Sequence, residues 1–378
     1  MPVEKGAQGG GQNKSGAPGS VTGAGNEAEV RQKLERQQTS LEQSFASLHD
    51  DARMANIRTA LEQTSANLAA LPGRLQKLRA RGYQFQSSLE QELARLAREW
   101  EQFKPQLAAS TERESQRLAA SMAAVQQEVL GGRRYISLPV SQISSKLEQS
   151  SAQLDNLKSE ISAASNTLQG MLNSASAGIG KAEKQIADAE AMLDELDAAS
   201  FRLLPGEAPV AMAHAEWLRG KDDEVKGLLF ITDHRLIFER NEEVVTKRRL
   251  LVFTEKKKVR EMMMETPIGA VEDVAIERVG GLFKKQMVKV VFTAPPAPYP
   301  QMLMSLRGDA EEWKGLITRV ITEDLEKERV AGEAQEQPQE PAEPTVLRCT
   351  GCGATLTAPI VKGMKSIQCE YCGTVIRL

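Results

Sequence analysis

Hydrophobic residues recur at alternating intervals of three and four along the first half of the chain. One row without a fault comprises Leu89, Leu93, Leu96, Trp100, Phe103 and Leu107, and a row at intervals of seven comprises Leu147, Leu154, Ile161 and Leu168. This spacing places the apolar side chains on one stripe of an α-helix, which must be buried against another helix. We therefore predict an α-helical coiled coil or bundle over residues 27–200.

Two interruptions divide this pattern. Leu71-Pro72-Gly73 and the stretch from Gly131-Gly132 to Pro139 contain residues that break or kink helices, so we expect helix breaks near 72–73 and 131–139. The stripe can be buried by folding back into an antiparallel bundle or by forming a homo-oligomer through the coiled coil. Periodicity alone does not choose between these two arrangements.

The hydrophobic pattern changes after Pro205-Gly206, which ends the helical region. Short apolar runs now follow one another closely, among them "GLLFI" and "RLIF" around Thr232-Asp233-His234. A single amphipathic stretch begins near Asp309, which we expect to cap that helix. Several strands followed by one helix predict a small α+β domain.

Residues 203–325 resemble GRAM and bacterial PH-like domains. The segment "GLLFITDHRLIF" resembles the family's G-x-L-x-L-T-x-x-R-L-x-F pattern, and "LLPGE", "PIGAVEDVAIE" and "DAEEWKGLI" are similar to its flanking strands and closing helix. The resemblance implies a strongly bent seven-stranded sheet capped at one end by a helix. It also implies that Arg235 is structural, although Asp233, His234 and Arg235 together could suggest a catalytic cluster.

Two segments lack the apolar residues that a packed core needs. Residues 1–26 are rich in Gly, Ser, Ala and Gln, and we predict a disordered N-terminal tail. Residues 326–345 are rich in Glu, Gln, Pro and Ala, and we predict a flexible acidic linker.

All four cysteines of the 378-residue chain lie near its C-terminus in two C-x-x-C pairs. They are Cys349, Cys352, Cys369 and Cys372, and the pairs are sixteen residues apart. Two such pairs supply the four thiolates of a tetrahedral site, and this spacing is typical of zinc. We predict one structural zinc ion per chain. Iron, as in rubredoxin, has the same ligands, whereas disulfides are disfavoured because no secretory segment precedes them.

The segment "CTGCGATLTAPIVKGMKSIQCEYCG" is similar to the zinc ribbons of bacterial multidomain proteins, particularly those that end in C-x-Y-C-G. The similarity covers residues 346–378 and implies a small β-structured zinc ribbon. Glycine after each second cysteine permits the positive φ that a metal-binding turn requires. Four thiolates leave no open coordination position, so the site is not expected to be catalytic.

One stretch of the sheet region is strongly basic. Residues 247–260 contain a single acid, Glu255, and seven cations: Lys247, Arg248, Arg249, Lys256, Lys257, Lys258 and Arg260. We predict that any anion or lipid binding runs through these residues, since each cation contributes about 1 kcal/mol near an anionic membrane. The alternatives are contact with protein or nucleic acid, and a solvated hairpin that keeps the domain soluble.

Composition narrows the functional classes. The net charge is −3, so the chain is not a polyelectrolyte that must bind nucleic acid. Only three histidines are present, so catalysis by histidine has few candidate residues. We predict a protein that is not an enzyme: a bacterial, cytoplasmic adaptor or scaffold that binds protein partners or the inner face of a membrane. The alternatives are a nucleic-acid-associated zinc-ribbon protein and a membrane-remodelling helical protein of the phage-shock or ESCRT-III-like type.

Overall fold

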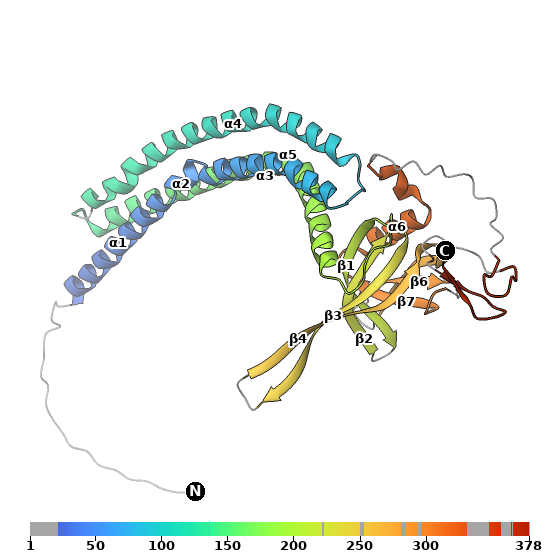
Figure 1. Ribbon diagram of the computed structural model, residues 1–378. Coiled ribbons are helices and arrows are strands. Elements are labelled where there is room, and N and C mark those ends of the chain that lie inside the picture. The colour runs from blue at the N-terminus through green and yellow to red at the C-terminus, as the bar shows by residue number, and fades with distance from the viewer. Residues whose placement is uncertain are drawn as a thin grey trace, which may run out of the picture. The chain divides into compact units, whose positions relative to one another are not determined.

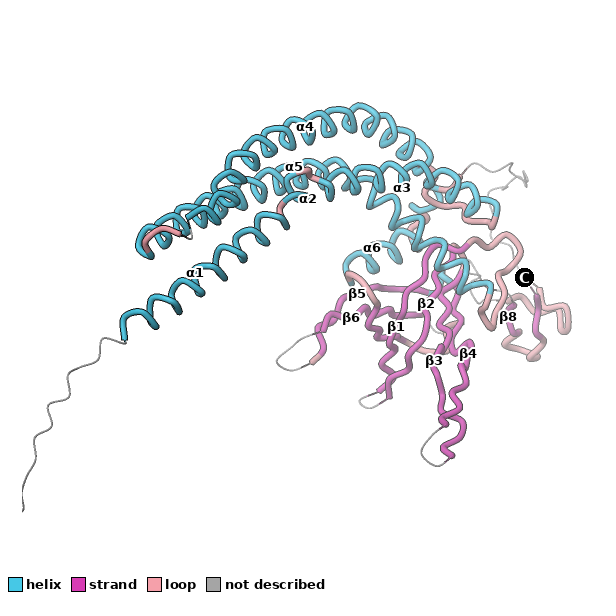
Figure 2. Tube along the Cα trace, turned by 90° about the vertical axis from the view of Figure 1, so that its left-hand side faces the viewer, coloured by secondary structure: helices cyan, strands magenta, loops and turns pink. Residues whose placement is uncertain are grey.

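The computed structural model describes residues 22–135, 137–220, 223–249, 253–280, 285–293, 296–330, 348–356, 364 and 366–377. For residues 22–26, 243–249 and 253–258 it describes the backbone alone. Long helices come first, a seven-stranded antiparallel sheet with one following helix comes next, and two short strands beside the cysteines come last (Figures 1 and 2). This order confirms the predicted fold class.

The chain divides into two compact units. The first contains residues 1–63 and 100–176, and the second contains residues 64–99 and 177–378. The helical region consists of α1 (Thr22–Ser47), α2 (His49–Ala52), α3 (Ala55–Ala80), α4 (Leu89–Gly131), the 3-10 helix η1 (Gly132–Tyr135) and α5 (Val140–Asp197). The helices α3, α4 and α5 each contribute residues to both units.

In the first unit the helices fold back on one another. Leu34 of α1 packs in one buried cluster with Ile143 and Leu147 of α5. The Gln38 side chain donates a hydrogen bond of 2.5 Å to the carbonyl oxygen of Val129, near the end of α4. Because these contacts join segments about 90 or more residues apart, the apolar stripe is buried within a single chain.

In the second unit ion pairs join α3 to α5, which run in the same direction. The Arg74 guanidinium of α3 makes two hydrogen bonds to the Glu190 carboxylate of α5, at 3.0 and 2.6 Å. Arg81 forms ion pairs with Asp194 and Asp197 at 2.8 and 2.9 Å. These contacts fix the end of α5, from which the chain enters the sheet.

The predicted helix break at Pro72 is wrong, because α3 continues through this residue to Ala80. Proline removes one backbone hydrogen bond and strains the turn before it, at a cost of about 3 kcal/mol. Burial of Leu71, Leu75 and Leu78, each at most 2% exposed, stabilises the helix on both sides. The helical chain is interrupted instead at Arg53–Met54 and at residues 81–88, while α4 ends at Gly131 and α5 begins at Val140.

The sheet contains β1 (Pro209–Gly220), β2 (Asp223–Thr232), β3 (Arg235–Arg249), β4 (Phe253–Pro267), β5 (Val271–Val279), β6 (Lys285–Phe292) and β7 (Gln301–Leu306). Its strand order is β4-β3-β2-β1-β7-β6-β5, and all neighbours are antiparallel. The 3-10 helix η2 (Ile268–Ala270) links β4 to β5. Residues 228–231 of β2 and 236–238 of β3 are at most 1% exposed, so both faces of these strands are covered. This burial explains why the two segments are continuous apolar runs in the sequence.

The helix α6 (Ala310–Ile321) follows the sheet. The Asp309 carboxylate caps it by accepting a hydrogen bond from the backbone N–H of Glu311, at 2.9 Å. Ile317 and Val320 are buried on its inner face, and its closest packing is against β5. A bent antiparallel sheet of seven strands closed by one C-terminal helix is a PH-like architecture.

The 3-10 helix η3 (Asp324–Glu328) occupies the start of the predicted linker. Beyond it, the backbone N–H of Val330 donates to Gln84 O, and Glu328 O accepts from the N–H of Ser87. The chain is therefore ordered to Val330, which corrects the expected linker start at residue 326. The rest of that linker, residues 331–345, and most of the predicted tail, residues 1–21, lie outside the described residues.

Candidate metal centre and ionic contacts

The four cysteines sit in two backbone turns of the same construction. The N–H of Gly353 donates to Cys349 O and that of Gly373 donates to Cys369 O, each at 2.8 Å. Both glycines have positive φ, 71° and 75°, which other residues rarely adopt. The strands β8 (Ser366–Gln368) and β9 (Val375–Arg377) pair beside the second turn. Repetition of one turn aims two pairs of sulfurs at a common point.

The sulfur positions fit one tetrahedral metal ion. All four Sγ atoms lie within 4.8 Å of one another, and the Cys349–Cys372 and Cys352–Cys369 Sγ distances are 3.5 and 3.7 Å. A tetrahedron with Zn–S bonds of about 2.3 Å has sulfur–sulfur edges of about 3.8 Å. The same distances exceed the ~2.05 Å of a disulfide. The four cysteines can therefore bind one metal ion.

The sequence did not predict one close contact between the two cysteine turns. A Cβ atom added at Gly351 would lie 2.4 Å from the Thr374 side-chain oxygen and 3.2 Å from its Cβ. Gly351 stands between the first two cysteines and Thr374 follows the last, so the two turns approach closely here. Only the folded arrangement shows that the "T-G" inside the first C-x-x-C needs its glycine.

The basic stretch forms the two arms of the β3–β4 hairpin. Strand β2 pairs with β3 only as far as Gly227 opposite Arg240, whereas β3 and β4 remain paired to Arg249 opposite Phe253. The hairpin therefore extends beyond the other strands, as Figures 1 and 2 both show. Six of the seven predicted cations lie on this extension: Lys247, Arg248, Arg249, Lys256, Lys257 and Lys258.

Arg260, the seventh predicted cation, has a different environment. Its guanidinium forms an ion pair with Glu195 of α5 and lies 3.5 Å from a Glu239 carboxylate oxygen. The Arg260 side chain is 16% exposed and that of Glu239 is fully buried. Glu239 also accepts a hydrogen bond of 2.5 Å from the backbone N–H of Ser200. Arg260 therefore fastens the end of α5 to the sheet and is not part of the projecting surface.

Arg235 is a buried structural cation. Its guanidinium bonds the carboxylates of Glu207 and Glu265, and the Glu265 distance is 2.6 Å. Burial lowers the pKa of Arg235, but the hydrogen bonds that its guanidinium donates to these carboxylates outweigh burial and raise that pKa. Thr232 donates a further hydrogen bond of 2.6 Å to Glu207. The buried charges of Arg235 and Glu207 are therefore paired and hydrogen-bonded, in agreement with the structural role that the family resemblance implied.

Asp233 and His234 form a second cluster beside it. The two side chains meet at 2.7 Å, between His234 Nδ1 and Asp233 Oδ1. Burial raises the pKa of Asp233, but hydrogen bonds from His234, the Ala208 backbone and Arg329 outweigh burial and hold that pKa below its usual value. These partners bind Asp233 from several sides, which suits a structural carboxylate.

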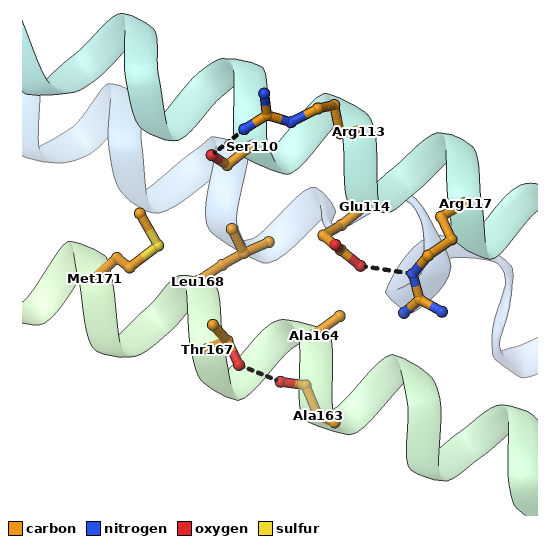
Figure 3. A pocket seen from close by; sticks show the side chains of 9 residues that line it. All are labelled: Ser110, Arg113, Glu114, Arg117, Ala163, Ala164, Thr167, Leu168 and Met171. Carbon is orange, nitrogen blue, oxygen red and sulfur yellow. Dashed lines mark hydrogen bonds and ion pairs between the residues drawn. The ribbon is translucent and has the colours of Figure 1, made fainter.

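A hollow of about 390 Å³ lies between α4 and α5 in the first unit (Figure 3). Ala163, Ala164 and Thr167 supply its α5 side, while Arg113 and Arg117 border it from α4. Arg117 is paired with Glu114 and Glu160, and Arg113 donates to the Ser110 hydroxyl. The hollow follows from the small side chains of α5, and its polar rim is hydrogen-bonded within the protein.

Among the described residues, no helix is long and apolar enough to cross a membrane.

Comparison with known proteins gives structural neighbours only. No family model and no curated protein matches the chain. A complex of PDZ-RhoGEF DH/PH domains with GTP-γ-S-activated RhoA aligns at 14% identity, covering 80% of this chain and 98% of that chain, with a TM-score of 0.24. Human RhoA in complex with a DH/PH fragment of PDZ-RhoGEF aligns at 13% identity, 78% and 93% coverage and a TM-score of 0.26.

A third neighbour is the C-terminal domain of an unknown protein from Leishmania infantum, at 16% identity. It covers 31% of this chain and 88% of its own, with a TM-score of 0.21. TM-scores this far below 0.5 do not establish a shared global fold, so no ligand or partner is carried over from these alignments. The PH-like assignment rests on the strand order and closing helix of the chain itself.

The alignments correct one sequence-based prediction. The chain was expected not to be an enzyme, yet the aligned DH/PH structures belong to RhoGEF proteins, whose name denotes nucleotide-exchange factors. The prediction of a non-enzyme is contradicted by these names and is withdrawn, and the alignments assign no activity to this chain. That prediction rested on the scarcity of histidine in the sequence and on the closed shell of four thiolates. Nucleotide exchange is a property of those RhoGEF proteins.

Proposed function

We propose that this chain is a scaffold that docks protein partners. In this proposal residues 27–200 form a helical arm, residues 203–325 a GRAM/PH-like docking domain and residues 346–378 a zinc ribbon that serves as a second docking module. The modules share one chain, so binding by one raises the effective concentration of the other at a common partner. We place the protein in the bacterial cytoplasm, on the resemblance of its ribbon and sheet domain to bacterial proteins.

The projecting β3–β4 hairpin is the observation that carries this proposal. Its arms pair with each other beyond Arg240, where β2 no longer pairs with β3, and each arm holds three of the six cations. An extended, charged element that leaves the sheet is suited to contact another molecule, and its charge favours an anionic one.

The test is affinity capture from the native cell, with membrane and soluble fractions kept apart. Wild-type protein and the triple variant Lys256→Glu, Lys257→Glu and Lys258→Glu serve as the two baits. Proteins that only the wild type retains support docking through the hairpin, provided that both baits melt at the same temperature. Identical sets of captured proteins contradict it.

We further propose that Cys349, Cys352, Cys369 and Cys372 hold one structural zinc ion. The sulfur distances and the donor set support zinc, and a closed shell of four thiolates favours stabilisation of the fold over catalysis. Among the described residues of this small module, the buried apolar side chains are Leu356, Ile367 and Ile376. Metal binding therefore contributes much of its folding free energy.

Elemental analysis tests the zinc proposal directly. We expect about one equivalent of zinc in reduced protein. Cys369→Ser removes a buried ligand, so it should release the metal and unfold the ribbon while leaving the melting transition of the sheet domain unchanged. Iron in place of zinc, or full zinc content in Cys369→Ser, contradicts the assignment.

An anionic membrane surface is the second candidate partner, favoured by the same six cations. Co-sedimentation with vesicles of rising anionic lipid content tests it. Binding that increases with lipid charge and disappears in the triple glutamate variant supports membrane contact. Sedimentation no greater than with neutral vesicles excludes it.

A further inference from the structure

The strand β4 is the terminal strand of the seven-stranded sheet. It pairs with β3 along one side, and in the described part of the chain no strand pairs with its other side. Figures 1 and 2 show that this hairpin extends past the other strands of the sheet. An unpaired strand edge presents a row of backbone donors and acceptors, which another extended chain can complete.

The register of the hairpin distributes the cations over both faces. Positions 256 and 258 share one face of β4, and position 257 lies on the other, because successive strand residues alternate. On β3, Arg248 pairs with Thr254 on the first face, while Lys247 and Arg249 pair with Glu255 and Phe253 on the second. Each face therefore holds three of the six cations.

This division decides between two kinds of partner. A flat anionic surface that meets one face of the hairpin reaches only three of the cations. A strand added to the edge of β4 continues the pleat, so its own side chains alternate between both faces and meet lysines on each. The edge geometry therefore fits an extended polypeptide better than a planar membrane.

We propose that the outer edge of β4, over residues 254–262, receives an extended acidic segment of a partner protein as an eighth strand. This inference rests on the docking function proposed above and names the partner's chemistry. Lys256, Lys257 and Lys258 are consecutive, so acidic residues on both faces of the incoming strand find a cation opposite or diagonal to them. Met262, 40% exposed, offers an apolar contact at the inner end.

Two other segments are less suited to pair with the edge of β4, one because of charge repulsion and the other because its prolines lack backbone donors. A second copy that pairs symmetrically through its own β4 brings lysines opposite lysines, which is destabilising. The chain's own acidic run at 331–345 contains Pro338, Pro341 and Pro344, and each proline removes a backbone donor. An acidic strand from another protein satisfies both the charge and the hydrogen bonds.

The experiment uses the full chain and a fluorescent peptide of alternating Glu with Val or Thr. A matched peptide has the same sequence but carries N-methyl groups on alternate amides, which keeps its charge and removes strand pairing. We expect the N-methylated peptide to bind at least about tenfold more weakly, a difference of roughly 1.4 kcal/mol. Lys257→Glu should weaken binding similarly, and Lys181→Glu on the exposed face of α5 should not.

Hydrogen exchange supplies a second readout. Peptide binding should slow amide exchange within residues 254–262 and leave α6 unchanged. Equal affinity for both peptides shows attraction by charge alone and overturns strand addition, although hairpin docking survives. Binding to anionic vesicles without binding to the peptide overturns it in favour of a membrane. Failure of the peptide, the vesicles and cellular capture together removes the docking function as well.

Discussion

Arg329 forms an ion pair with Asp233, which lies 96 residues earlier in the chain. The same guanidinium lies over the Phe85 ring, 4.8 Å from its centroid, and bonds the Gln84 side chain. One arginine thus joins the turn between β2 and β3, the loop between α3 and α4, and the segment that follows α6. These three segments are distant in sequence and belong to one compact unit.

Arg329→Ala should destabilise this unit. The substitution leaves Asp233, whose side chain is 3% exposed, without its guanidinium partner. Removing one member of a buried pair costs ~3–5 kcal/mol, and since Arg329 is 26% exposed we expect about 2 kcal/mol. Urea denaturation measures the change. Lys327→Ala is the matched control, because its pair with Asp324 lies at the surface, where solvent screens it, and the unfolding free energy should barely change.

Acid should weaken the same cluster. The pKa of Asp233 is lower in the folded chain than its ordinary value of 3.8. A lowered carboxyl pKa stabilises the fold above that ordinary value, and this contribution disappears as the pH falls through the folded-state pKa. Unfolding free energies measured between about pH 5 and about pH 2 should fall less steeply for Asp233→Asn than for the wild type. Parallel profiles would assign the acid sensitivity to other carboxylates.

A methyl group at Gly227 should be poorly tolerated. A Cβ atom there would lie 2.2 Å from the carbonyl oxygen of Glu239 and 2.9 Å from the Phe238 ring. Overpacking of a buried site costs about 1–3 kcal/mol or more, and here the obstacle is backbone. Gly170→Ala on α5 is the opposite case, because nothing lies within 4 Å of its added Cβ. We expect that variant to gain up to about 1 kcal/mol in thermal or urea unfolding.

Gly351→Ala should weaken zinc retention. The new methyl group meets Thr374, so the two cysteine turns must move apart. Competition with a chromophoric chelator measures the rate of zinc loss, which we expect to rise. The double variant Gly351→Ala with Thr374→Ala removes the obstructing atoms and should restore slow release. A double variant that loses zinc as fast as Gly351→Ala shows that the backbone of residue 351 is the cause.

The local pattern of the sequence determined the elements and the ligands. Intervals of three, four and seven fixed which residues of α3, α4 and α5 face inward, because a helix repeats every 3.6 residues wherever its stripe is buried. The cysteine pairs likewise identified the four thiols that can bind one metal ion, since two C-x-x-C turns at this spacing are typical of metal sites. The apolar runs of "GLLFITDHRLIF" predicted two strands around a turn, which is a local signal, and the resemblance of this segment to GRAM and PH-like domains implied the type of sheet.

The tertiary structure alone decided what each charge does and where helices end. Pro72 breaks a helix by local rules, and burial of Leu71 and Leu75 overrides them. Arg260 belongs to a basic run in the sequence, yet it binds Glu195, which is 65 residues away. Strand register divided the remaining cations between two faces. Contacts between distant segments depend on how the whole chain packs, so a linear pattern identifies the charged residues but does not identify their partners.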